Sequence, residues 1–155
     1  MTDYVLVHGG AHAAWCWERL TPFLKRDHRV GRVIALDLVG HGARVNEKPQ
    51  DQITLEDYIQ DVVEAIQRQD LHQVVLVGDS MAGAIIPQGA ARVRERMKRL
   101  VLLAAMIPRE GTSGRETLDE LGLDRLSSPP GGTTEELYRH LFCNDMDEAT
   151  AQWLL

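Results

Sequence analysis

Short apolar segments alternate with amphipathic segments over residues 1–108. Four segments consist mainly of aliphatic residues, which is typical of strands buried on both faces: 4–7, 33–38, 74–77 and 100–105. Three intervening segments have the periodicity or the small residues of helices packed on a sheet: 14–25, 55–69 and 81–96. This order predicts an α/β fold with three layers, in which a parallel sheet with right-handed crossovers is flanked by helices.

The helix expected over 55–69 has the clearest sequence signal. Its apolar residues recur at spacings of three and four: Leu55, Tyr58, Ile59, Val62, Val63 and Ile66. Thr54 precedes them as an N-cap, and Asp57 takes the place of the usual glutamate of a capping box. In the other two helices, Pro22 and Pro87 are expected to limit or bend the helix.

The pattern changes after Pro108. Short helices are expected over 116–126, 135–142 and 147–155, and the prolines and glycines of 127–134 indicate a linker. We therefore expect two parts, a partial α/β core over 1–108 and a segment of a helical cap over 109–155.

The segment from Val74 to Gly83 carries the most informative pattern. An apolar strand breaks into a turn at Ser80 and then enters a helix. Around this serine, Gly78, Ala82 and Gly83 are all small. A serine on a sharp strand-to-helix turn has a strained backbone, and larger side chains at these positions would collide. The pattern predicts that Ser80 is displayed as a nucleophile at a helix N-terminus.

Two further glycine-bearing loops follow expected strands. His8-Gly9-Gly10 follows the first strand, and Gly40-His41-Gly42 follows the second. Glycines let backbone N–H groups approach a ligand or a developing oxyanion, although a plain strand–turn–helix connection contains the same residues. Because the carboxyl ends of parallel strands meet at one edge, these loops and Ser80 are expected to lie at the same edge.

Composition bears on which kinds of ligand or partner the protein binds and on its cellular location. A formal net charge of -6 argues against a nucleic-acid binder. The two cysteines, Cys16 and Cys143, have neither disulfide nor metal-ligand spacing, so we expect no metal, no cofactor and a cytoplasmic location. The N-terminal residues lack a basic region and a long apolar run, so neither a signal peptide nor a membrane-spanning segment is expected.

Three separated motifs together resemble the α/β-hydrolase superfamily. They are the segments 8–17, 37–42 and 78–83, which read HGGAHAAWCW, DLVGHG and GDSMAG. Their order and spacing are similar to the branch that contains plant methyl esterases, hydroxynitrile lyases and small bacterial esterases. The segment after Leu103 also resembles the start of the cap of that branch. The resemblance implies serine chemistry on a small-molecule carboxylic ester.

The resemblance also implies roles for individual residues. Ser80 matches the nucleophile, and the backbone N–H groups of Met81 and Gly10 match the two oxyanion donors. His12 and Trp15 match positions expected to face the pocket, whereas His8 is expected to hold its own loop.

Two residues depart from the commoner form of the serine motif. Ala82 replaces the more usual glycine, which keeps the site small. Asp79 stands where histidine or glutamate is more usual. A carboxylate beside the nucleophile would disfavour a nearby anion.

The superfamily's triad runs in the order serine, acid, histidine. The resemblance places the acid and the histidine beyond Leu155, so the chain resembles a truncated member of the superfamily. We expect slow ester turnover, because a serine hydroxyl needs a base within hydrogen-bond reach. His12 and His140 are the histidines expected on the correct side, and neither has an evident acid partner in the sequence.

Three functional hypotheses follow from these residues. The first is a serine esterase, which is favoured because hydrolases dominate the branch. The second is a carbon–carbon lyase of the hydroxynitrile lyase type. The third is a truncated, non-catalytic copy that binds a small apolar ligand or associates with itself. Self-association would use the segment 100–103, which is expected to form an open sheet edge.

Overall fold

The computed structural model describes residues 1–120, 122 and 134–155 of the 155-residue chain. The chain forms two compact units, Met1–Pro108 and Arg109–Leu155. Within the described ranges, no helix is both long enough and apolar enough to cross a membrane.

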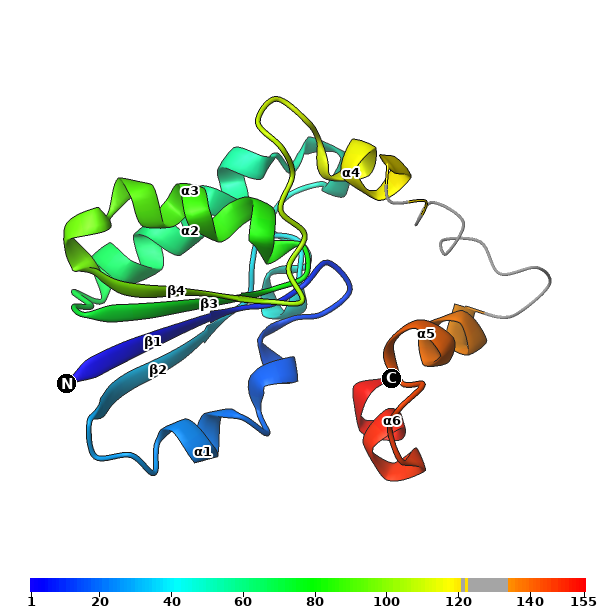
Figure 1. Cartoon of the computed structure of the whole chain (residues 1–155), viewed down its shortest axis with the longest axis horizontal. Helices are drawn as coiled ribbons and strands as arrows, with labels where there is room; N and C mark the ends of the chain where they lie inside the picture. Colours follow the sequence, from blue (N-terminus) through cyan, green and yellow to red (C-terminus); the bar gives the residue numbers. More distant parts are fainter. Residues whose placement is uncertain (121, 123–133) are drawn as a thin grey trace. The chain divides into compact units, whose positions relative to one another are not determined.

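A four-stranded parallel sheet forms the centre of the first unit (Figure 1). Its strands lie in the order β2-β1-β3-β4. Their bounds are Thr2–Val7 for β1, Val30–Leu36 for β2, Val74–Asp79 for β3 and Met97–Leu103 for β4. In the register, Val7 pairs with both Leu36 and Gly78, and Asp79 pairs with Leu103. The carboxyl ends of all four strands therefore meet at one edge of the sheet, as predicted.

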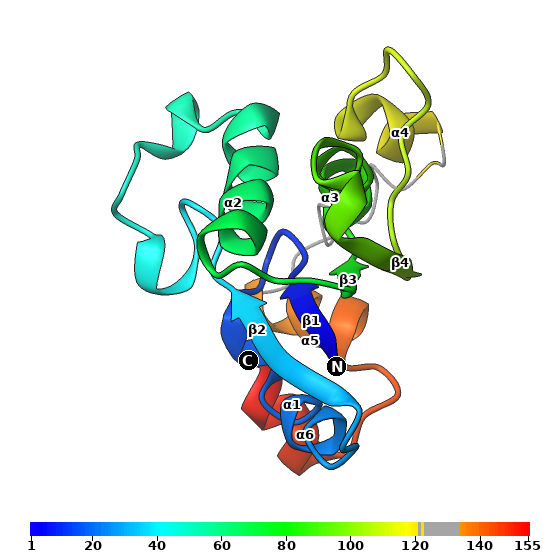
Figure 2. The same cartoon turned by 90° about the vertical axis from the view of Figure 1, so that its left-hand side faces the viewer.

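Helices cover both faces of this sheet (Figures 1 and 2). The α-helices α2 (Leu55–Arg68) and α3 (Ala82–Arg92) cover one face, and the short helices η1 (Ala14–Trp17) and α1 (Thr21–Leu24) cover the other. The three-layer α/β fold predicted from the sequence is thereby confirmed.

Successive residues of the central strands enter two different cores. Val5, Val7 and Leu76 pack under α2 and α3 in the larger core. Leu6, with Val75 and Val77, packs with Trp17 on the opposite face. Since both faces are covered, successive positions of β1 and β3 are apolar, and the strands read as continuous apolar runs.

The predicted start of α2 is confirmed at the atomic level. The Asp57 N–H donates to the Thr54 hydroxyl at 3.3 Å, and the Thr54 N–H donates to the Asp57 carboxylate at 2.8 Å. Lys48 and Thr54 hold the pKa of Asp57 at about 2. This reciprocal capping box satisfies backbone donors that the first helical turn leaves unpaired.

Two helix predictions are wrong in extent. The segment 14–25 contains two short helices, η1 and α1, in place of one long helix. Pro22 lies in the first turn of α1, where its missing N–H is tolerated, so a helix begins there. The helix expected to reach 96 ends at Arg92, and the short helix η4 (Arg94–Arg96) follows it.

The bounds of the two outer strands also differ from the prediction. Strand β2 begins at Val30 and β4 begins at Met97, three residues earlier than expected in both cases. The first residues of these edge strands include exposed polar side chains, such as Arg32 and Lys98. The prediction missed them because it relied on continuous apolar segments. Strand β4 ends at Leu103 because Ala104 has a left-handed backbone with φ of 42°.

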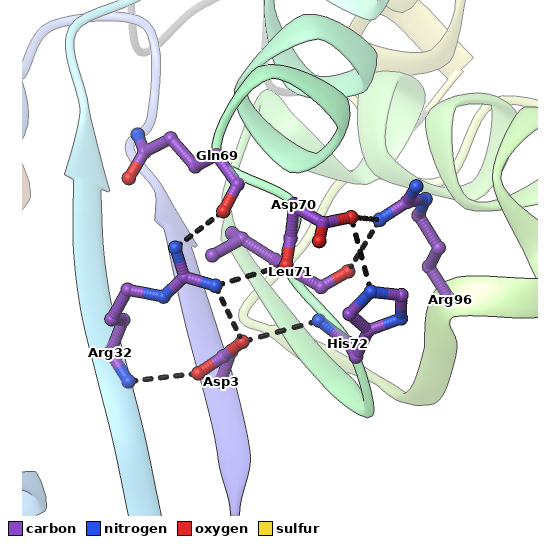
Figure 3. Close-up of polar contacts among 7 residues, drawn as sticks. All are labelled: Asp3, Arg32, Gln69, Asp70, Leu71, His72 and Arg96. Carbon is purple, nitrogen blue, oxygen red and sulfur yellow. Dashed lines mark hydrogen bonds and ion pairs between the residues drawn. The ribbon is translucent and has the colours of Figure 1, made fainter.

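A polar network closes the amino-terminal edge of the sheet (Figure 3). The Asp3 carboxylate accepts from the backbone N–H groups of Arg32 at 2.8 Å and His72 at 3.2 Å. The Arg32 guanidinium donates to the Asp70 carbonyl at 3.0 Å, and Arg96 donates to the Asp70 carboxylate at 2.8 Å. These bonds tie the α2–β3 connection to β1, β2 and η4, and so fix where β3 begins.

Two further short helices, η2 (Gly42–Arg44) and η3 (Gln50–Gln52), lie between β2 and α2. The second unit contains three helices within the described residues: α4 (Gly114–Glu120), α5 (Thr134–Phe142) and α6 (Glu148–Leu154). The predicted helices over 135–142 and 147–155 correspond to α5 and α6. The first residues of the helix expected over 116–126 belong to α4. Most of the other residues of that prediction, and most of the expected linker, lie outside the described residues.

Candidate active site

Ser80 occupies a strained turn between β3 and α3. Its φ of 49° is in the left-handed region, which non-glycine residues rarely adopt. The Ser80 N–H donates to the Leu103 carbonyl at 3.2 Å, while the Ser80 carbonyl accepts from Met106 N–H at 2.9 Å. The segment after β4 therefore holds the strained peptide from both sides, and the Ser80 residue itself is exposed.

Small residues around Ser80 are required by close packing. A Cβ atom on Gly78 would lie 2.6 Å from Ile86 Cδ1 and 2.9 Å from Ala82 Cβ. A Cβ atom on Gly83 would overlap with the backbone carbonyl of Met106. The steric reason predicted for the small residues therefore holds, and Gly83 makes room for backbone as well.

The loop after β1 crosses directly over the serine. A Cβ atom on Gly9 would lie 3.0 Å from both Ser80 Cβ and Asp79 Oδ2, and 3.6 Å from Ser80 Oγ. A Cβ atom on Gly10 would lie 3.4 Å from Met81 Sδ. The structure therefore brings the predicted residues Gly10, Ser80 and Met81 together at the carboxyl edge of the sheet.

The His8 ring holds this loop by hydrogen bonds to backbone groups, as predicted. Its ring is fully buried, and the Leu38 N–H donates to Nε2 at 3.2 Å. Nε2 is therefore the acceptor, and Nδ1 carries the proton that is donated to the Gly9 carbonyl at 2.8 Å. Burial lowers the pKa of His8, which favours this neutral form.

His12 and Trp15 both lie next to the same loop. The His12 N–H donates to the Gly9 carbonyl at 3.2 Å. The His12 and Trp15 rings meet edge to face, with centroids 5.6 Å apart. Burial lowers the pKa of His12, and the charge of Asp79 opposes this shift.

Asp79 is the acidic neighbour that the sequence did not reveal for His12. Burial raises the pKa of Asp79, while the charge of His12 and the N–H of Ser80 act in the opposite direction. The expectation that His12 has no evident acid partner is therefore wrong. His12 follows β1 and Asp79 ends β3, and these strands are neighbours in the sheet but distant in sequence. Strand adjacency is the signal that would have found the pair.

Asp37 and His41 belong to the loop that the sequence placed at this edge, but their contacts were not predicted. The Asp37 carboxylate accepts from the Ala14 N–H at 2.7 Å and from the Ala43 N–H at 3.0 Å. His41 Nε2 lies 3.0 Å from the Gly10 carbonyl oxygen. The loop after β2 is therefore bonded to the loop after β1, which carries Gly10.

The remaining histidines of the first unit lie elsewhere, and the nearby cysteine is a poor nucleophile. The His28 side chain is 94% exposed, and His72 pairs with Asp70 at the amino-terminal edge. Burial, assisted by the charge of Asp79, raises the pKa of the Cys16 thiol to about 12. Cys16 is therefore protonated at neutral pH, whereas the Ser80 residue at the same edge is exposed.

A charged groove runs along strand β2 and does not include the serine turn. Its volume is about 770 Å³, and its polar lining includes Asp37, Arg44, Glu47, Asp61, Glu64 and Arg68. Arg44 pairs with Asp61 at 2.8 Å and with Glu47 at 2.7 Å, so these charges compensate one another. Within the described part of the chain, no three histidine, cysteine or acidic side chains are grouped to hold a metal ion.

Comparisons with known proteins find relatives that are named as esterases. A carbendazim hydrolyzing esterase of Nocardioides sp. (strain SG-4G) is 34% identical over 113 residues, covering 73% of this chain and 46% of the relative. Methylesterase 1 of Arabidopsis thaliana is 32% identical over 137 residues, covering 87% of this chain and 51% of the relative. The chain spans about half the length of these curated relatives.

Solved structures and a family profile extend the likeness over the chain. The solved structure of an extracellular alpha/beta-hydrolase from a Paenibacillus species has a TM-score of 0.73 at 26% identity, covering 98% of this chain and 63% of that one. The profile of the "Alpha/beta hydrolase family" matches residues 4–155. Since that match includes nearly every residue, the chain belongs to the alpha/beta hydrolase family.

Proposed function

We propose that the chain carries the nucleophile and the oxyanion hole of a serine esterase that acts on small carboxylic esters. The observation that carries this proposal is the left-handed, exposed Ser80 beside the Gly9-Gly10 loop. A strained serine held in this way fits a displayed nucleophile better than a structural turn. Relatives named as esterases favour the same chemistry.

In this mechanism, Ser80 Oγ attacks the carbonyl carbon of the ester and loses its proton to a base. The carbonyl oxygen becomes an oxyanion, which the N–H groups of Gly10 and Met81 stabilise. The alcohol then leaves with a proton, and water hydrolyses the acyl-serine. Met81 immediately precedes α3, so its N–H lies where the helix dipole favours negative charge.

We propose further that this chain alone turns over esters slowly. His8 and His41 direct both ring nitrogens at backbone groups. Burial lowers the pKa of His12, which makes it a weak base. Slow activation of the water that hydrolyses the acyl-serine would then limit the rate.

The remaining parts of the proposal concern the second unit and the cellular location of the protein. We infer that Arg109–Leu155 is a segment of a helical cap, and that the protein acts in the cytoplasm. The free thiols of Cys16 and Cys143 favour a reducing compartment.

Two alternatives compete with the esterase proposal. A carbon–carbon lyase would use the same serine on a cyanohydrin-type substrate, and the half-buried Asp79 would disfavour a negative charge on that substrate. A non-catalytic role in self-association would use strand β4, where Leu102 and Leu103 are 40% and 50% exposed. The names of the relatives favour the esterase over both.

Reaction with p-nitrophenyl acetate tests the proposal in two stages. We expect one equivalent of p-nitrophenol to be released as Ser80 is acetylated, followed by slow turnover. Ser80→Ala should remove the acetylation, whereas the exposed control His28→Gln should retain it. Unchanged acetylation in Ser80→Ala would contradict the assigned nucleophile. Fast, Ser80-dependent turnover would contradict only the proposal of a weak base.

A further inference from the structure

His41 directs both of its ring nitrogens at backbone carbonyl oxygens. Nδ1 lies 3.1 Å from the Val39 oxygen, and Nε2 lies 3.0 Å from the Gly10 oxygen. A carbonyl oxygen can only accept, so each nitrogen must carry its own proton to form a hydrogen bond. A neutral imidazole has one N–H, whereas an imidazolium has two. Both contacts are therefore hydrogen bonds only when His41 is protonated.

Two imidazoles thereby hold successive carbonyls of one loop. His8 Nδ1–H binds the Gly9 carbonyl, and His41 faces the Gly10 carbonyl. The two rings are 4.9 Å apart. In a trans peptide the C=O and N–H point in opposite directions, and the structure has no cis peptide among its described residues. The bond to the Gly9 carbonyl therefore sets the direction of the Gly10 N–H, and the bond to the Gly10 carbonyl sets the next peptide.

Titratable and charged groups face His41 from the loop after β1 and from α2. Burial is the main cause that lowers the pKa of His8, and a charge on His41 lowers it further. The Tyr58 ring of α2 lies 5.9 Å from the His41 ring. Also from α2, the Asp61 carboxylate accepts from the Val39 N–H at 2.8 Å and pairs with Arg44.

We propose that His41 is a positioning residue whose protonated ring bridges Val39 and Gly10 and so locks the loop that carries the Gly10 N–H. The bridge is complete while both ring nitrogens carry a proton, and loss of either proton removes one of its two hydrogen bonds. The bridge is inferred from the pair of contacts that His41 makes, and it does not depend on the proposed function. Its effect on an oxyanion rests on the proposed function, because only there does the Gly10 N–H bind a substrate oxygen.

Nuclear magnetic resonance of the full chain tests the bridge without requiring turnover. The ring ¹⁵N signals of His41 and the carbonyl ¹³C signal of Gly10 are followed between about pH 5 and pH 8, where histidine titrates. We expect the two groups of signals to move together with one midpoint. In His41→Gln, which retains a donor that cannot titrate, the Gly10 signal should stay constant with pH. The exposed control His28→Gln should titrate at Gly10 as the wild type does.

Hydrogen exchange of the His12 N–H, which is bonded to the Gly9 carbonyl, reports the order of the loop. His41→Phe keeps a ring against Tyr58 but removes both donors. We expect exchange to be about tenfold faster in this variant, the factor that loss of one ordinary hydrogen bond produces. His41→Gln should restore part of the protection.

A Gly10 signal that does not follow His41, or that titrates equally in His41→Gln, would overturn the bridge. Acetylation of Ser80 in the same samples separates the two proposals. If Gly10 titrates while Ser80 is not acetylated, the bridge stands and the esterase proposal fails. If Ser80 is acetylated while Gly10 is insensitive to His41, the bridge fails and the esterase proposal stands.

Discussion

The two edges of the sheet are built from polar residues in opposite ways. At the amino-terminal edge, Asp3 and Asp70 are bonded to arginines. At the carboxyl edge, His8 is buried, and His12 and Asp79 are half-buried, beside the backbone around Ser80. The same sheet therefore presents charged pairs at one edge and partly buried titratable groups at the other.

The pKa shifts follow this division. Burial raises the pKa of Asp79 and lowers that of His8 and His12, so all three shift towards the neutral form. Burial opposes ionisation of Asp3 as well, but the N–H groups of Arg32 and His72 outweigh it and lower its pKa. The amino-terminal edge thus favours the charged form of its carboxylate, whereas the carboxyl edge favours the neutral forms of its titratable groups. Suppressed charges are typical of catalytic and binding sites, although structural networks also perturb pKa values.

The largest expected effect concerns close packing at the carboxyl edge. Gly83→Ala should destabilise the fold by about 3 kcal/mol, the upper range for overpacking, because the new Cβ meets the backbone of Met106. Gly89→Ala in the same helix is the matched control. Its Cβ would lie 3.1 Å from the Val62 side chain, which can adjust. Equal urea midpoints for the two variants would contradict the packing at Ser80.

The next effect concerns the charged edge. Asp3→Asn should cost about 2 kcal/mol, since bonds to an ionised group are worth more than neutral ones. The folded pKa of Asp3 lies below its unfolded value of about 3.9. Its contribution is therefore complete above about pH 4 and is lost as the pH falls through the folded pKa. Urea unfolding at a series of pH values should show this acid dependence in the wild type and less of it in the variant.

A smaller effect of opposite sign is expected at Asp79. Its raised folded pKa means that stability falls as the pH rises from about 4 through that pKa. Asp79→Asn should therefore stabilise the fold slightly at neutral pH, by less than Asp3→Asn destabilises it. The same variant should lower the pKa of His12 in a ¹H–¹³C titration, because the opposing charge is removed. A His12 pKa that is unaffected would show that the two side chains do not interact.

The smallest effect is expected for an exposed ion pair away from both edges. Glu56 pairs with Arg92 across α2 and α3, with side chains that are 62% and 40% exposed. Exposed pairs of this kind contribute little to stability. Glu56→Gln should leave the urea midpoint unchanged, and a clear loss of stability would mean that such pairs matter here as much as Asp3.

Local sequence signals predicted the parts of the molecule that are determined locally. The N-cap of α2 depends on Thr54 and Asp57, three residues apart, and the turn at Ser80 depends on neighbours two or three residues away. Both were predicted correctly because steric and capping rules act over one helical turn. The long helix expected over 14–25 failed because its apolar spacing did not reveal that a new helix begins at Thr21.

Contacts between distant segments could not be predicted in the same way. His41 reaches Gly10, the charge of Asp79 acts on His12, and Asp3 binds Arg32 only because the sheet order is β2-β1-β3-β4. The sequence indicated which residues follow strands but not which strands are neighbours. The polar connections of the candidate site therefore emerge only with the tertiary structure.

The most direct test of the account is covalent capture of Ser80 by a small fluorophosphonate. We predict a single adduct on Ser80 by peptide mass mapping, none in Ser80→Ala, and changed amide signals for Gly10 and Met81 in the adduct, since its phosphoryl oxygen occupies the oxyanion position. An adduct on another residue would contradict the claim that Ser80 is the nucleophile of this edge. So would an adduct on Ser80 that leaves both amide signals unchanged, because the two N–H donors would then not face the reacting centre.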